Sequence, residues 1–376
     1  MSKKQEFIII VLTIVAMLGY LLLANPRMMD DGFGYEGFTE SLAHGKIDFN
    51  SFYGTQGLSI LAVPVFWATG SHISIIITSM ILVLLSIPLC YMLGKKFWKS
   101  QEGGLYYVAL FLLTCFPYVT LMRGFVEAAV FFFSILVVYL SLNNSNWTPW
   151  AWAFGAIVKP FNLFLFPLFM GNFLNKKRIW FLACGVALGV LYMGINYYQT
   201  GHVLNTAILT SYSGDYNTSK NPPLLANFTF GLVDTFKNFA RIAANLLVDS
   251  RKIMIAPIVT LLGIFGLLEG FKNNPETRKF SYAFILVVLF GGSMLYSFPK
   301  YLLPAVAITS LFAVGFLIRY RWLMFLVLAG SINTFLGVFN YHGVDFWSKQ
   351  IFYLPIIFAG FLYLLILYFF KPEHAQ

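Results

Sequence analysis

Two adjacent carboxylates follow the first long apolar run of the chain, in the stretch NPRMMDDGFGYEG from Asn25 to Gly37. A carboxylate can take the proton of an attacking hydroxyl group, which is the role of a general base. Asp30 and Asp31 can also cap the helix predicted to follow them, because an aspartate at a helix start satisfies free backbone N–H groups. The two roles are compatible, so the pair is a candidate for both.

A short helix is expected directly after this pair. Tyr35, Phe38 and Leu42 recur at helical spacing, while Glu36 and Glu40 lie elsewhere on the helical wheel. This pattern is typical of a helix that lies in the membrane interface.

A second candidate is the pair Arg123 and Glu127, in the stretch FPYVTLMRGFVEAAVFFF. Residues four apart share one face of a helix. Because a charge at bilayer depth costs a few kcal/mol, the pair should face protein or a water-filled cavity. The alternative is a structural ion pair that closes the turn between two spans.

The third candidate is Lys159, which interrupts the apolar stretch IVKPFNLFLFPLF immediately before Pro160. A proline disfavours helix in the residue before it, so the chain is expected to break at this lysine. A broken helix with a lone cation at depth is typical of a site for an anionic ligand. The alternative is a lysine that snorkels to the membrane surface.

Two further basic positions precede later spans. Arg251 and Lys252 follow Asp249 in LLVDSRKIMIAPIV, and Lys300 and Tyr301 lie in FPKYLLPAVA. Singly, each can be an interfacial anchor. Together with Lys159 they can form a cationic cradle for phosphate opposite the carboxylates of Asp30 and Asp31.

The composition describes the elements that must position these residues. The chain has 376 residues, of which 59% are hydrophobic and 11% are charged, and its mean hydropathy is +0.75. These values exclude an ordinary soluble protein and predict an all-α polytopic membrane protein. Apolar runs of about 20 residues recur along it, which suits a bundle of about 11 to 12 transmembrane helices.

Residues 1–376 are expected to form a single transmembrane domain with no separate soluble domain. The expected segments are 1–24 for the N-terminus and first span, 25–71 for a catalytic outer loop with interfacial helices, 72–198 for a helical core, 199–253 for a second outer loop, and 254–376 for the last spans. The first run is kept as a span because it exceeds a usual signal-peptide core. Cys90, Cys115 and Cys184 lie in apolar runs and are expected to be small core residues.

Charge sets the orientation. If Lys3 and Lys4 are cytoplasmic and the spans alternate, the inner side carries 14 Lys and Arg against 5 acids, and the outer side 11 against 10. The positive-inside rule therefore predicts a cytoplasmic N-terminus, a plasma or inner membrane location and an extracytoplasmic site. The net charge of +10 follows this membrane pattern, so no nucleic-acid partner is expected.

At these residues the chain resembles the GT-C superfamily of integral-membrane glycosyltransferases, particularly enzymes that use polyprenyl-phosphate sugars, such as mannosyl- and aminoarabinosyltransferases. Asp30-Asp31 resembles the acidic motif of the first outer loop. PYVTLMRGFVEAAVFF resembles the family's turn before a span that opens with Glu, and VKPFNLFLFP its break at a cation and proline. Lys300 departs from the family, in which an Arg is commoner, and replaces a bidentate fork with a point charge.

The resemblance implies an inverting transfer of a sugar from a polyprenyl-phosphate donor to a hydroxyl acceptor, either a lipid or a cell-surface glycan. Asp30 or Asp31 would then be the base, and some of Lys159, Arg251, Lys252 and Lys300 would stabilise the leaving phosphate. Membrane lipids are the other expected partners. Carboxylates of the first loop can hold a divalent cation, but no ligand set is complete, so the cofactor stays unassigned.

Two alternatives remain open. A secondary transporter or lipid flippase also uses broken helices, although such proteins usually contain internal repeats, which this chain lacks by inspection. A polymerase or ligase of lipid-linked glycans also acts at the outer face, and it would use a diphosphate-linked donor.

Overall fold

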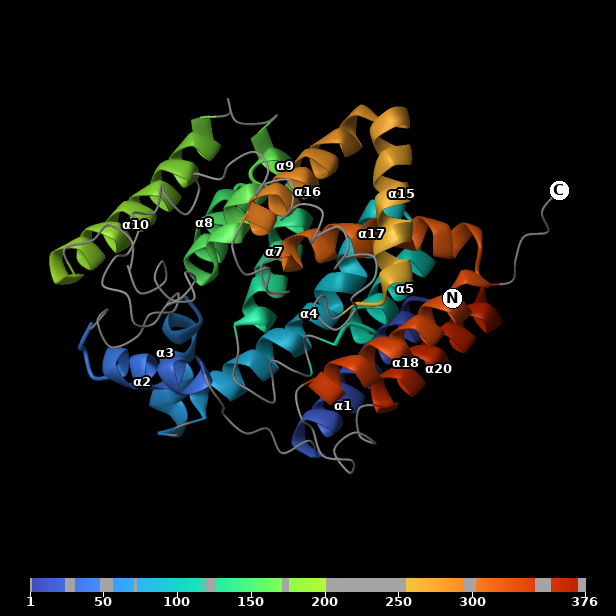
Figure 1. The fold of residues 1–376 in the computed structure, drawn as a ribbon, viewed down its shortest axis with the longest axis horizontal. Coiled ribbons are helices and arrows are strands. Elements are labelled where there is room, and N and C mark those ends of the chain that lie inside the picture. Colours follow the sequence, from blue (N-terminus) through green and yellow to red (C-terminus); the bar gives the residue numbers. More distant parts are fainter. Residues whose placement is uncertain are drawn as a thin grey trace.

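The structure is a computed structural model of the chain, shown in Figure 1. It describes residues 2–23, 31–47, 57–70, 73–115, 118, 126–170, 176–200, 255–293, 302–341 and 353–370. Within these residues it contains fourteen α-helices, one short 3-10 helix and no strand, as the composition predicts.

The first half of the chain holds ten of these elements. They are α1 (Lys3–Leu23), α2 (Asp31–Ala43), α3 (Gly57–Thr69), α4 (Ser74–Trp98), α5 (Gln101–Leu112), α7 (Glu127–Leu142), α8 (Thr148–Val158), the 3-10 helix η1 (Pro160–Leu165), α9 (Pro167–Met170) and α10 (Lys176–Thr200). The second half holds α15 (Pro257–Asn273), α16 (Pro275–Ser293), α17 (Leu303–Arg319), α18 (Leu323–Tyr341) and α20 (Tyr353–Phe369).

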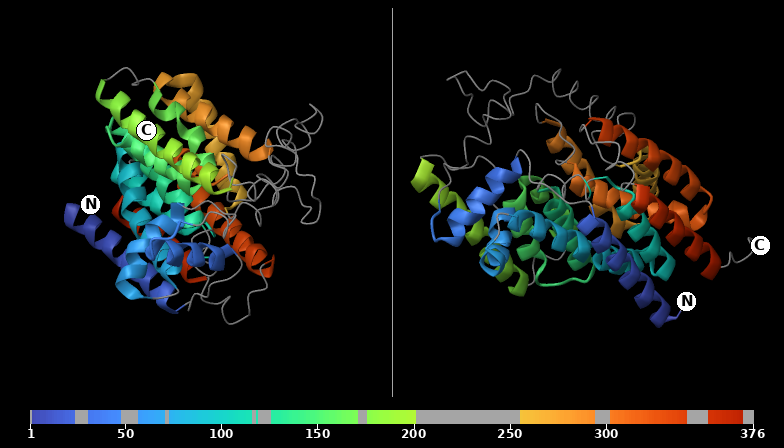
Figure 2. Two further views of the ribbon diagram at one scale, coloured as in Figure 1. Left: turned by 90° about the vertical axis from the view of Figure 1, so that its left-hand side faces the viewer. Right: turned by 90° about the horizontal axis from the view of Figure 1, so that it is seen from below.

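Among the described helices, α1 and α4 are long and apolar enough to cross a membrane unaided. Several shorter apolar helices, including α7, α17 and α20, lie within the segments 72–198 and 254–376, where further spans are predicted. Both views in Figure 2 show α1 at the edge of the bundle, where Phe7, Leu12, Val15 and Leu22 expose their side chains. Such a face suits contact with lipid.

The centre of the bundle is formed by α5 and α17. Every side chain from Glu102 to Leu112 is buried, and so is every one from Leu303 to Val314. Helix α15 packs closely on α17 because Gly263 faces the backbone of Thr309, where a Cβ atom would collide with the carbonyl oxygen. Small residues allow such close contact between helices in a membrane. Cys90 and Cys115 are buried free thiols, which confirms their expected role as core residues.

The central helices also define the two ends of the bundle. Gly263 of α15 lies on Thr309, and Gly266 lies on Phe312 three residues later, so α15 and α17 run in the same direction. Trp98, the last residue of α4, donates its indole N–H to the carbonyl of Leu311 at 2.9 Å, at the middle of α17, and its ring packs against Gly315 in the second half of that helix. The first residues of α4, α15 and α17 therefore lie towards one end, and their last residues towards the other.

The end that holds the last residues of α4, α15 and α17 is strongly charged, and we call it the basic end. Three ion pairs join helix ends there: Glu6 with Lys95 at 2.9 Å, Glu102 with Arg321 at 2.9 Å, and Glu269 with Arg319 at 3.2 Å. The predicted topology puts all six of these charged residues on the same side of the membrane, and the structure places them at the same end of the bundle. Which side faces the cytoplasm stays a prediction.

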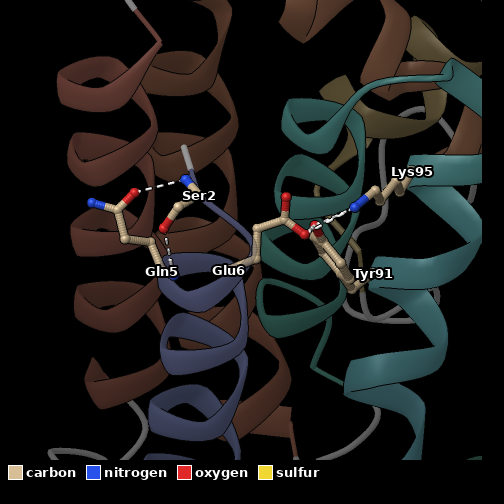
Figure 3. A network of polar contacts seen from close by, with 5 residues as sticks. All are labelled: Ser2, Gln5, Glu6, Tyr91 and Lys95. Carbon is tan, nitrogen blue, oxygen red and sulfur yellow. Dashed lines mark hydrogen bonds and ion pairs between the residues drawn. The ribbon is translucent and has the colours of Figure 1, made fainter.

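The N-terminal part of this end is fixed by Glu6, a buried residue whose side chain is only 8% exposed (Figure 3). One carboxylate oxygen accepts hydrogen bonds from the Tyr91 hydroxyl at 2.5 Å and the Lys95 ammonium at 2.9 Å. Ser2 and Gln5 exchange hydrogen bonds between backbone and side chain, in the pattern of a capping box. The start of α1 is thus tied to the last turns of α4.

Candidate functional site

The break at Lys159 is the best described part of the candidate site. Helix α8 ends at Val158, Lys159 has an extended backbone with φ of −158° and ψ of 127°, and η1 begins at Pro160. This confirms the predicted break and its cause. The Lys159 side chain is 4% exposed, so protein surrounds it. A lysine that snorkels to the surface would be far more exposed, so the structure does not support that alternative.

Asn162, buried within η1, holds this break in place. Its side-chain amide donates to the carbonyl of Gly155 at 3.0 Å and accepts from the Ser134 hydroxyl of α7 at 2.8 Å. Its backbone N–H donates to the carbonyl of Lys159 at 3.1 Å. The chain on both sides of Lys159 is therefore fastened to α7.

Glu127 is the first residue of α7, as the family pattern predicts, and it is 4% exposed. Ser134 lies seven residues later, on the same face of the helix and about 10 Å further along its axis. Since Ser134 contacts Asn162, the face of α7 that carries Glu127 is the face that meets η1. Glu127 and Lys159 thus belong to one unit of α7, α8 and η1.

Helix α3 joins this unit to α2, the helix that begins at Asp31. Gly57, at the start of α3, lies against the end of α8, where a Cβ atom would be 2.6 Å from the Cα of Val158. The neighbouring Ser59 donates its hydroxyl to the carbonyl of Tyr35 in α2 at 2.9 Å. Figure 1 shows α2 and α3 side by side in blue, next to α4. Helix α3 therefore contacts both Val158, the residue before Lys159, and α2, the helix that begins at Asp31.

Glu36 fixes α2 against α4, and sequence reasoning missed this role. Helical spacing placed Glu36 off the apolar face, whereas the structure buries it to 4% exposure. Its carboxylate accepts from the Ser74 hydroxyl at 2.7 Å and from the Ile75 backbone N–H at 2.9 Å. Ile73, the residue before α4, makes no side-chain cap, so Glu36 caps α4 from another helix. One signal in the sequence could have indicated this role: no Asp or Asn stands at the start of α4, so its first N–H groups need an acceptor from another part of the chain.

Replacement of Glu36 by leucine is expected to destabilise the protein by about 2 kcal/mol or more, because the Ser74 hydroxyl and the Ile75 N–H lose their buried acceptor. The measurement is thermal unfolding in detergent, followed by tryptophan fluorescence. Glu40→Gln removes a carboxylate from a half-exposed position of the same helix and serves as the control. Equal melting temperatures for Glu36→Leu and wild type would contradict the capping role.

The aspartate pair and most of the basic candidates fall largely outside the described residues. Asp31 begins α2, where a cap is expected, and its side chain is not described. Asp30, Arg123, Arg251, Lys252, Lys300 and Tyr301 lie outside the described residues. By sequence, Lys252 and Lys300 stand a few residues before the first residues of α15 and α17, which lie towards the same end as the start of α4.

A metal site was left unassigned by the sequence. Among the described residues, no group of three or more His, Cys, Asp and Glu side chains is placed to hold a metal ion.

Comparison with solved structures identifies the fold. The chain is similar to ArnT from Cupriavidus metallidurans bound to undecaprenyl phosphate, with a TM-score of 0.60 and 12% sequence identity, over 97% of this chain and 76% of that one. The apo state of the same protein gives a TM-score of 0.61 at 11% identity with the same coverage. The predicted resemblance to GT-C proteins is therefore confirmed for the fold, and with the apolar helices it indicates a membrane protein. No protein-family model matches the sequence, and no curated protein matches it.

Proposed function

We propose, from this shared fold, that the protein is an inverting GT-C glycosyltransferase that moves a sugar from a polyprenyl-phosphate donor to a hydroxyl acceptor, a lipid or a cell-surface glycan, at the extracytoplasmic face. The observation that carries the proposal is the likeness to ArnT over 97% of the chain, in a structure that contains undecaprenyl phosphate. That ligand supplies the class of donor: a long apolar chain that ends in a phosphate.

The buried cation at the helix break supports the same chemistry. Lys159 is enclosed by protein and lies next to the α3 helix that packs on α2. A cation in a site with little water stabilises negative charge far more than it would in solution. Such a charge grows on the phosphate oxygen when the bond to the anomeric carbon of the sugar breaks.

The reaction needs a base as well. The acceptor hydroxyl attacks the anomeric carbon, Asp30 or Asp31 takes its proton, and the lipid phosphate leaves from the opposite face of the sugar. Lys159, with Arg251, Lys252 and Lys300, balances the charge on the leaving phosphate. Arg123, Glu127 and Tyr301 are assigned to the surrounding substrate site.

The direct test is to incubate the purified protein with a panel of undecaprenyl-phosphate sugars and to follow consumption of each donor. We expect turnover of at least one monophosphate-linked donor in the presence of a membrane glycolipid acceptor. Turnover of only a diphosphate-linked glycan would instead identify a polymerase or ligase. Counterflow of labelled lipid without any bond cleavage would identify a flippase.

A second expected result concerns the basic residues before α15 and α17. Lys300→Ala and Arg251→Ala should each raise the KM for the donor by about tenfold, because each removes a charged contact to phosphate. Lys300→Arg should lower it, since the guanidinium can bind two phosphate oxygens at once. Lys46→Ala, which removes an exposed cation near α2, is the control. Unchanged donor dependence in both alanine variants would remove these residues from the phosphate site.

A further inference from the structure

A cavity lies at the basic end, and Lys159 is not among its lining residues. It has a volume of about 460 Å³ and is bounded by the last turns of α4, α15 and α17 and the first turns of α16. Ligand sites in proteins commonly have volumes of about 300 to 1,000 Å³. The cavity is therefore large enough for a small molecule or for the head of a lipid.

The inner wall of the cavity is aromatic. Phe97, Phe280 and Phe312 form a triangle in which each pair of ring centroids is 5.1 to 5.6 Å apart. Trp98 lies beside them, and its ring packs against Gly315, where a larger residue would collide with it. Its hydrogen bond to the carbonyl of Leu311 fixes the ring in place. These side chains offer a rigid apolar surface for the glycerol or acyl part of a lipid.

The rim of the cavity is cationic. Lys96, Lys99, Lys279 and Arg319 line it from three helices, together with Glu269 and Glu276. Glu269 forms an ion pair with Arg319, with a distance of 3.2 Å between the carboxylate oxygen and the guanidinium nitrogen. Lys96 and Lys99 are exposed and form no ion pair with any described residue. Two exposed lysines at the end of α4 therefore face an apolar-walled cavity, and neither is paired with a described carboxylate.

The backbone at Lys99 is also unusual. Its φ of 52° places it in the left-handed region, where glycine is the usual residue at a helix end. Lys99 therefore occupies a position that glycine would suit better.

We propose that this cavity binds the phosphate headgroup of an anionic membrane lipid, with Lys96 and Lys99 on the phosphate and the aromatic wall on the adjoining glycerol and acyl groups. Basic pockets between membrane helices on the cytoplasmic side are typical sites for anionic headgroups. The excess of Lys and Arg on this side predicts that it faces the anionic leaflet. The site is separate from the proposed transfer site and does not depend on that function.

The test compares the binding of the purified protein in neutral detergent to phosphatidylglycerol, phosphatidylcholine and sn-glycerol 3-phosphate, by native mass spectrometry and thermal unfolding. We expect phosphatidylglycerol to raise the melting temperature and phosphatidylcholine to leave it unchanged. The double variant Lys96→Gln/Lys99→Gln should lose roughly tenfold in apparent affinity for phosphatidylglycerol, because each lysine contributes attraction near an anionic headgroup.

Matched variants separate this site from general charge effects. Lys3→Gln/Lys4→Gln removes two exposed positive charges at the start of α1, outside the cavity, and should keep wild-type affinity. Lys99→Gly should raise the melting temperature without lipid, since it relieves the left-handed lysine, and should reduce the added effect of phosphatidylglycerol. Equal affinity losses in the two double variants, or none in either, would overturn the proposal. An equal response to sn-glycerol 3-phosphate would overturn the lipid as the ligand and identify a soluble phosphate ester.

Discussion

Replacement of Asp31 by asparagine is expected to lower the turnover of a polyprenyl-phosphate sugar by about 10²- to 10⁴-fold, the usual contribution of a general base. Asparagine keeps the shape and can still accept a hydrogen bond at a helix start. The cap at the start of α2 should therefore survive the change, while the ability to take a proton is lost. The variant should therefore keep the melting temperature of the wild type while its turnover of the donor falls.

Asp30→Asn is the partner experiment, because the two aspartates are adjacent and only one of them needs to be the base. The variant with the larger fall in kcat identifies that residue. Glu40→Gln is the control, since it removes a carboxylate from the same helix at a half-exposed position. If both aspartate variants turned over the donor at the wild-type rate, neither aspartate would be the base.

Lys159→Met should lower kcat/KM for the donor by about 10²-fold, which is typical when one charge-stabilising group is removed from an active site. Methionine resembles lysine in length and retains the apolar contacts of the buried stem. Its lack of charge leaves the leaving phosphate without the cation enclosed at the break between α8 and η1. Lys159→Arg keeps the charge and should recover part of the activity.

The control for this experiment is Lys46→Met, which removes an exposed cation close to the end of α2. Melting temperature and gel filtration must accompany the kinetics, so that loss of activity is compared only between folded samples. A folded Lys159→Met variant with wild-type donor kinetics would place this lysine outside the donor site.

Much of the fold follows from local patterns in the sequence. The recurring apolar runs predicted an all-helical chain, and the break at Lys159 followed from one proline, because the restriction on the residue before proline is purely local. The opening of α7 at Glu127 and the burial of Cys90 and Cys115 also agree with expectation.

The contacts that hold the candidate site together could not be read in this way. Glu36 reaches Ser74 across 38 positions of sequence, and Ser134 reaches Asn162 across 28. A polar residue on a helical wheel shows only that one face is polar, and gives no sign of the helix that will cover it. Pairing of this kind depends on tertiary packing, which periodicity does not encode.

The break at Lys159 also has a consequence for the way the protein enters the membrane. Helix α8 has 11 residues and rises about 16 Å, roughly half of the hydrocarbon thickness, and η1 and α9 are shorter still. None of them can be threaded through the bilayer as an independent unit, and their buried lysine and asparagine oppose it further. The place of this segment in the membrane therefore depends on the helices that pack on it, α7 before it in the chain and α10 and α16 after it, so it reaches its final position by helix assembly.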